Sequence, residues 1–138
     1  MMKHSFTLCF IILLFIIPIG AMAQNALTID IKGLRNDQGH VLLQLFDENE
    51  KLVKEIKQPI ENKECTILLT DLETGRYGFK YFHDENDNQN LDTNWVRIPK
   101  EGFGFSNNAK ANFGPPSFIK WVFELSGNKE LICSPQYF

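Results

Sequence analysis

The sequence predicts an all-β protein: a seven-stranded antiparallel β-sandwich with one long ordered loop. Three observations lead to this fold class. Short segments alternate between apolar and polar residues, turn-forming residues separate them, and no segment has the period of an amphipathic helix. Seven short strands at this spacing are typical of two packed β-sheets.

The first four expected strands follow one another closely. Apolar residues alternate in segment 27–31, and the turn-forming residues 36–39 lead into a second alternating segment, 41–45. Segment 51–60 alternates less regularly and carries more charge, which suits the edge of a sheet. Segment 65–69 completes this half of the predicted sandwich.

Three more strands are expected towards the C-terminus. Residues 74–75 form a turn before segment 77–82, whose aromatic residues favour a strand. In segment 119–125, four apolar residues at alternate positions, with Lys120 and Glu124 between them, predict a sixth strand. A turn at 126–128 then leads to the last expected strand, at 131–133.

A long segment, 83–117, interrupts this pattern. Connections longer than about 12–15 residues without structure of their own are uncommon and are usually functional or disordered. Four aromatic residues argue against disorder here: Trp95, Phe103, Phe105 and Phe113. We therefore expect a folded loop that carries the function.

The first half of this loop has oxygen-bearing side chains at alternate positions. They are Asp84, Asn86, Asn88, Asn90 and Asp92. A calcium-binding loop places oxygen ligands at positions 1, 3, 5, 7 and 9, and these five residues have that spacing. Calcium is therefore a candidate cofactor, expected to bind with the weak affinity of extracellular modules, roughly 0.1–1 mM.

Two positions depart from a calcium loop. Gln89 stands where the sharp turn normally has glycine, and Trp95 stands where a bidentate glutamate is expected. The alternative is a loop held by side-chain hydrogen bonds to the backbone, which asparagine and aspartate form without a metal. The sequence leaves both interpretations open.

The candidate ligand-binding residues lie along the whole loop. They are His83, Trp95, Lys100, Glu101, Phe103, Phe105, Asn107 and Asn108. Phe103, Phe105 and Phe113 either form a binding platform or pin the loop to the sandwich. We expect pinning, because an ordered loop must bury apolar surface to offset its lost entropy.

The N-terminal residues 1–23 predict a cleaved signal peptide. Lys3 supplies the positive charge, segment 8–17 is an apolar run, and Ala21-Met22-Ala23 offers small residues for cleavage. The run is shorter than the roughly 20 residues that span a bilayer. We therefore expect an exported protein, periplasmic or extracellular, with 24–138 as a single β-sandwich domain and no membrane span after cleavage.

Charge and cysteine content narrow the classes of partner and site. The formal net charge of −3 gives no electrostatic case for nucleic acid or an anionic membrane surface. Cys65 and Cys133 remain after cleavage. An oxidising compartment would permit a disulfide bond between them, but their alternating apolar surroundings favour two small buried side chains.

Three stretches of the chain resemble a known family. HDENDNQNLDTN, IPKEGFGFSNNA and FGPPSF are similar to the signature of the domain of unknown function 2141 family. That resemblance implies export and a β-sandwich, and it implies no activity. Gln89 and Arg97 stand where the resemblance leads one to expect glycine. Gln89 puts the metal geometry in question, and Arg97 indicates either a changed backbone or a locally basic rim.

A shorter segment resembles a different group of β-sandwiches. Leu72-x-x-Gly75-x-Tyr77 is similar to the start of a strand in immunoglobulin-like and transthyretin-like modules. The resemblance implies that Gly75 makes the turn and that the Tyr77 hydroxyl pins the corner.

Three hypotheses for function follow. No nucleophile stands beside a base in a known catalytic motif, so the first is a non-enzymatic extracytoplasmic binding module with its unknown ligand on 83–117. The second is a structural or assembly component that contacts an envelope protein. The third is a hydrolase that uses His83, Asp84 and Asp92.

Overall fold

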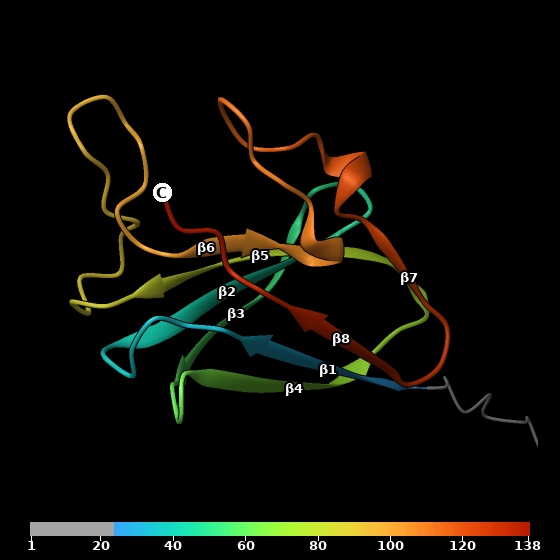
Figure 1. Ribbon diagram of the computed structural model, residues 1–138. Helices are drawn as coiled ribbons and strands as arrows, with labels where there is room; N and C mark the ends of the chain where they lie inside the picture. The colour runs from blue at the N-terminus through green and yellow to red at the C-terminus, as the bar shows by residue number, and fades with distance from the viewer. Residues whose placement is uncertain (1–23) are drawn as a thin grey trace, which may run out of the picture.

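Two β-sheets face each other across an apolar core in the computed structural model, which describes residues 24–138 (Figure 1). The strands are β1 (Asn25–Lys32), β2 (His40–Asp47), β3 (Leu52–Pro59), β4 (Glu64–Leu72), β5 (Gly75–Asp84), β6 (Phe103–Phe105), β7 (Phe123–Leu125) and β8 (Lys129–Cys133). Two 3₁₀ turns, η1 (Ser106–Asn108) and η2 (Phe118–Lys120), are the only helices within 24–138. The all-β prediction is confirmed, and the expected signal peptide lies outside the described residues.

The strand number and the purely antiparallel pairing were predicted wrongly. Eight strands form a three-stranded sheet, β4-β1-β8, and a five-stranded sheet, β3-β2-β5-β6, in which β7 also pairs with β5. β8 runs parallel to β1. Parallel neighbours need a long connection, and the chain between β1 and β8 provides one. Alternation of apolar residues is the same beside a parallel or an antiparallel neighbour, so the sequence could not distinguish them.

The core follows the predicted alternation. Leu27, Ile29 and Ile31 of β1 are fully buried, and the alternate residues of β2, β4 and β5 meet them from both sheets. The Tyr77 hydroxyl donates to the Glu73 carbonyl oxygen at 2.9 Å. The tyrosine therefore pins the corner before β5, as its sequence context predicts.

The expected strand 119–125 is only half formed. Residues 118–120 make the turn η2, and only 123–125 pair with β5 as β7. Trp121 packs on the outer face of the five-stranded sheet, whereas Phe123 enters the main core. A Cβ atom on Gly78 would lie 2.7 Å from the Trp121 ring, so the glycine makes room for it. Packing of this indole against the outer face overrides the alternation.

The single long loop predicted at 83–117 is two loops. Residues 83–84 belong to β5, and β6 returns to pair with residues 80–82 of β5. Loop 85–102 therefore precedes β6, and loop 106–122 follows it before β7. Figure 1 shows both projecting from the same side of the molecule. None of the helices between residues 24 and 138 has the length and apolar character needed to cross a membrane.

The two cysteines within residues 24–138 are buried free thiols on opposite sides of β1. Cys65 of β4 and Cys133 of β8 are each in register with Ile31. Adjacent strands lie about 4.8 Å apart, so the two Cα atoms are separated by roughly 10 Å. A disulfide bond needs Cα atoms within about 7 Å. The native fold therefore keeps the two thiols apart, even in an oxidising compartment.

Both thiols should resist modification in the folded protein. Burial raises the pKa of Cys65 and of Cys133 to about 11, so neither is a thiolate at neutral pH. A colorimetric thiol reagent should label neither in buffer and both in denaturant. Rapid labelling of the native protein at neutral pH would contradict the packing.

Burial of the two thiols should also make the stability of the protein depend on pH. The thiols of the unfolded chain ionise from about pH 8.5, whereas those of the folded protein have a pKa of about 11. The stabilisation from keeping them neutral is therefore complete below about pH 8.5, and the free energy of unfolding should fall as the pH rises from there towards 11.

Candidate functional site

The outer face of the five-stranded sheet carries a second apolar cluster. Phe103 and Phe105 of β6 are in register with Phe82 and Lys80 of β5, so their side chains share this outer face. Between them, Gly104 faces inwards, where a Cβ atom would lie 2.4 Å from the Tyr81 hydroxyl oxygen. The buried members of the cluster are Phe103, Phe105, Ala111 and Trp121, and Phe46, Phe82, Leu91, Ala109 and Phe118 pack against them.

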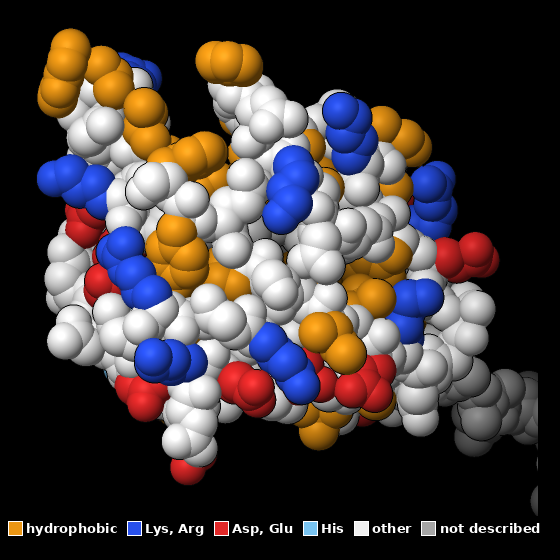
Figure 2. Space-filling view, in the orientation of Figure 1, with side chains coloured by type: hydrophobic (Ala, Val, Ile, Leu, Met, Phe, Trp, Pro, Cys, Tyr) orange, Lys and Arg blue, Asp and Glu red, His pale blue; other side chains and the backbone are white. Residues whose placement is uncertain are grey.

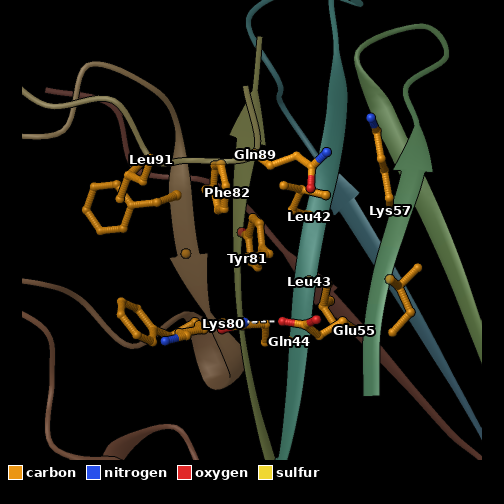
Figure 3. A pocket seen from close by; sticks show the side chains of 14 residues that line it. Leu42, Leu43, Gln44, Glu55, Lys57, Lys80, Tyr81, Phe82, Gln89 and Leu91 are labelled. Carbon is orange, nitrogen blue, oxygen red and sulfur yellow. Dashed lines mark hydrogen bonds between the residues drawn. The ribbon is translucent and has the colours of Figure 1, made fainter. Parts of the chain in front are cut away.

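Part of this face remains open as a groove of about 460 Å³. Its apolar floor comes from strands and its wall from loop 85–102. The lining residues used below are Leu42, Lys80, Phe82, Leu91, Phe103 and Phe105. Figure 3 shows Gln89 and Leu91 towards one end of the groove, and Gln44, Glu55 and Lys80 towards the other.

The charged residues around the groove are not equivalent. The ammonium of Lys57 lies 3.3 Å from the Asp87 carboxylate, which also contacts His40. The hydrogen bond from His40, helped by Lys57, lowers the pKa of Asp87. The Lys80 ammonium instead lies 5.2 Å from the centre of the Phe46 ring and forms no ion pair with a described residue. Among the described residues, Lys80 is thus the cation of the groove that no acidic side chain neutralises.

Two buried carboxylates fix the shape of loop 85–102. Asp84 accepts the N–H groups of Asn88, at 3.1 Å, and Gln89, at 2.8 Å, through different oxygens. Glu101 accepts the N–H groups of Glu85 and Asp92, each at 3.0 Å. Asp84 therefore closes the turn at 88–89. Glu101 ties the beginning of the loop to its middle.

Hydrogen bonds within the chain hold the predicted calcium ligands, here called the arc: Asp84, Asn86, Asn88, Asn90 and Asp92. The amide nitrogen of Asn86 lies 2.6 Å from one Asp92 oxygen, and that of Asn88 lies 2.9 Å from the other. The amide of Asn90 donates to the carbonyl oxygen of Asn88. Within 24–138, no group of three or more His, Cys, Asp or Glu side chains is placed to hold a metal. Asp84 uses both oxygens within the loop and is buried, so Asp92 is the carboxylate around which the arc gathers.

His83 is a structural residue. Its side chain is fully buried, and Nε2 lies 2.7 Å from the carbonyl oxygen of Gln38, which can only accept. Nδ1 lies 3.1 Å from the Tyr137 hydroxyl, whose oxygen accepts the N–H of Arg35. In the neutral imidazole, Nε2 therefore donates to Gln38 and Tyr137 donates to Nδ1. Both ring nitrogens are occupied, so the geometry argues against the hydrolase hypothesis built on His83.

Arg35 joins the base of loop 85–102 to the sandwich. Its guanidinium forms an ion pair with Glu85, donates to the Lys100 carbonyl oxygen at 2.9 Å and lies over the Tyr137 ring. Burial disfavours the charged form of Glu85, but the hydrogen bond and charge of Arg35 outweigh it and lower the pKa of Glu85. A shallow polar hollow at this base includes Asn86, Asp92 and Glu101.

Gln89 and Arg97, the two positions at which the sequence resemblance implies glycine, have a backbone conformation that favours glycine. Gln89 has φ 62° and Arg97 has φ 64°, both in the left-handed region. Arg97 therefore adopts a left-handed conformation although it carries a side chain.

The remaining candidate residues have different roles. Trp95 lies at the exposed tip of loop 85–102. Asn107 donates to the Val122 carbonyl oxygen, and Asn108 donates to that of Ile132 and accepts the Ser134 N–H. These two asparagines therefore fasten loop 106–122 and the C-terminal segment. Lys100 is exposed beside the polar hollow.

Sequence reasoning missed the strand residues on the groove floor. Leu42 of β2 and Phe82 of β5 line the groove, and Phe46 of β2 packs in the neighbouring outer-face cluster; all three occupy outward positions where a solvent-facing sheet carries polar residues. A strand with apolar residues on both faces indicates cover on both sides. The run Val41 to Phe46 contained that signal.

Comparison with known proteins gives one family. A family profile described as "Uncharacterized protein conserved in bacteria (DUF2141)" matches residues 29–132, from β1 to β8. Neither the curated proteins nor the solved structures gave a match.

Replacing Glu101 by glutamine should destabilise the protein by about 1–3 kcal/mol. Glutamine keeps one acceptor oxygen, so one of the two backbone N–H groups held by Glu101 loses its partner in a buried site. Chemical denaturation measures the change. Glu130→Gln, at an exposed position of β8, is the matched control and should change stability by less than about 0.5 kcal/mol. Equal stabilities of the two variants would rule out the bridging role of Glu101.

Proposed function

The chain belongs to the DUF2141 family, uncharacterized proteins conserved in bacteria, and we propose that it is an exported, non-enzymatic binding module. The observation that carries the proposal is the groove on the outer face of the five-stranded sheet. Its volume of about 460 Å³ lies in the range of small-molecule sites, about 300–1,000 Å³. The support for export is the N-terminal sequence pattern of residues 1–23.

The lining of the groove suggests the chemistry of the ligand. Leu42, Phe82 and Phe103 offer an apolar surface, while Lys80 offers an ammonium without an acidic partner among the described residues. A ligand with an apolar body and one anionic group would bury apolar area and neutralise that charge. We therefore infer an amphipathic organic anion.

The absence of an activated nucleophile from this groove favours binding over catalysis. None of the described residues that line it is a histidine, serine or cysteine. His83 is enclosed by its own hydrogen bonds, and Ser106 is buried with its hydroxyl bonded to the backbone of β5. Neither side chain can reach a molecule in the groove.

As a second element, we propose that the arc of loop 85–102 takes calcium weakly. Asn86, Asn88 and Asp92 already converge, and rotation of each amide would turn its oxygen towards the same point. Amide and carboxylate oxygens are the ligands that calcium prefers. The ion would replace existing hydrogen bonds, and Asp84 would stay in its internal role. Both features support low affinity.

The groove should bind anilinonaphthalene sulfonate, a fluorescent probe with an apolar body and one anionic group. Leu42→Glu places a carboxylate on the floor and should weaken binding by about tenfold or more. Lys80→Gln should weaken it less. Leu68→Glu, exposed on the outer face of the other sheet, is the control and should bind like wild type. Unchanged binding by a folded Leu42→Glu variant would exclude this groove as the site.

Calcium binding is tested by isothermal titration into chelator-treated protein, together with thermal denaturation. We expect a Kd of about 0.1–1 mM and a higher Tm at saturation. Asp92→Asn should abolish both effects. Asp87→Asn, in the same loop but paired with His40 and Lys57, should retain them. A titration without heat and without a Tm change would refute the calcium proposal and leave the groove untouched.

A further inference from the structure

Two aromatic side chains stand exposed at the tips of the two projecting loops. Trp95, in loop 85–102, is 94% exposed, and Phe113, in loop 106–122, is fully exposed. Val96 and Ile98 beside Trp95 are also exposed. Figure 2 shows hydrophobic side chains at the ends of both projections, on the side from which the loops of Figure 1 extend.

Hydrogen bonds of Asn94 fix the turn that carries Trp95. The Asn94 side chain accepts the N–H groups of Val96, at 3.0 Å, and Ile98, at 2.9 Å. The backbone of Asn94 also pairs with Ile98 and Arg97. This tight turn is fixed by its own hydrogen bonds, so Trp95 reaches a partner surface at little cost in entropy.

The second tip has a comparable base. The Trp121 indole N–H donates to the Pro116 carbonyl oxygen, and the Ala111 N–H donates to the Gln136 side chain. Phe113, between these anchors, has φ 58°, an unusual conformation for a bulky residue. The first tip is therefore held by its own turn and the second by bonds that include Trp121, and both aromatic side chains stay exposed.

Basic side chains are concentrated in segment 93–122, which carries both tips. Segment 93–122 contains four basic side chains, Arg97, Lys100, Lys110 and Lys120, all exposed. Its one acidic residue, Glu101, is buried. The other described residues carry nine basic and sixteen acidic side chains. The net charge of −3 averages over this asymmetry, which is why it gave no case for an anionic surface.

We propose that the two tips dock the protein on an anionic lipid bilayer. Tryptophan and phenylalanine enter the headgroup region from separate convex points, whereas a protein partner would need a matching pocket for each. The four cations lie on the same two loops as the aromatic tips and would be attracted to the lipid phosphates. The inference does not depend on the groove ligand or on calcium, and the docked protein would remain peripheral.

The test is co-sedimentation of the purified protein with phosphatidylglycerol–phosphatidylcholine vesicles and with phosphatidylcholine vesicles. We expect binding to the anionic vesicles that weakens at high salt. Tryptophan fluorescence should shift to the blue on binding and be quenched by brominated lipid. The change reports on Trp95, because Trp121 is already buried in the free protein. The double variant Trp95→Ser/Phe113→Ser should bind about tenfold more weakly or worse. Leu68→Ser/Ile132→Ser, with two exposed apolar residues on the opposite sheet, should bind like wild type.

Several results would overturn the proposal. One is no binding of the wild type to anionic vesicles, and another is equal binding by the tip variant. Equal, salt-insensitive binding to phosphatidylcholine would remove the role of the cations. Self-association that requires Trp95 and Phe113, without vesicle binding, would show that a second copy of the chain covers the tips instead.

Discussion

The architecture depends on how one edge of β5 satisfies its backbone hydrogen bonds. β2 pairs with one edge, and a buried strand cannot leave the other edge unpaired. β6 pairs with residues 80–82 and β7 with residues 75–77. In the interval, the Ser106 hydroxyl accepts the N–H of Phe79 at 3.0 Å and donates to the carbonyl oxygen of Trp121. The chain must therefore return to β5 twice.

This requirement explains why one side of the molecule carries every candidate feature. Each return to β5 leaves a loop outside the sheet: loop 85–102 joins β5 to β6, and loop 106–122 joins β6 to β7. Phe103, Phe105 and Trp121 anchor them to the outer face and build a second apolar cluster there. The groove is the part of this face that the loops do not cover. The tips are the parts of the loops that the cluster does not hold.

The sequence predicts the core of this fold well and its outer layer poorly. Alternation in β1, β2, β4 and β5 follows from burial against one core, and local periodicity is sufficient to detect it. The parallel β1–β8 pair and the short β6 depend on partners distant in sequence, which periodicity does not report. Loop 83–117 was the right region to single out. However, the groove floor comes from Leu42 and Phe82 in strands already assigned to the sandwich.

Side-chain hydrogen bonds, rather than glycine, determine the backbone of loop 85–102. Gln89 and Arg97 keep left-handed conformations that normally favour glycine. Asp84 accepts the N–H of Gln89, and the Asn94 side chain accepts the N–H groups on both sides of Arg97. Each turn is thus closed by a side-chain acceptor a few residues earlier in the chain, so it tolerates a side chain at modest cost. At one of these turns the tolerated residue is a cation, Arg97, placed two residues after Trp95.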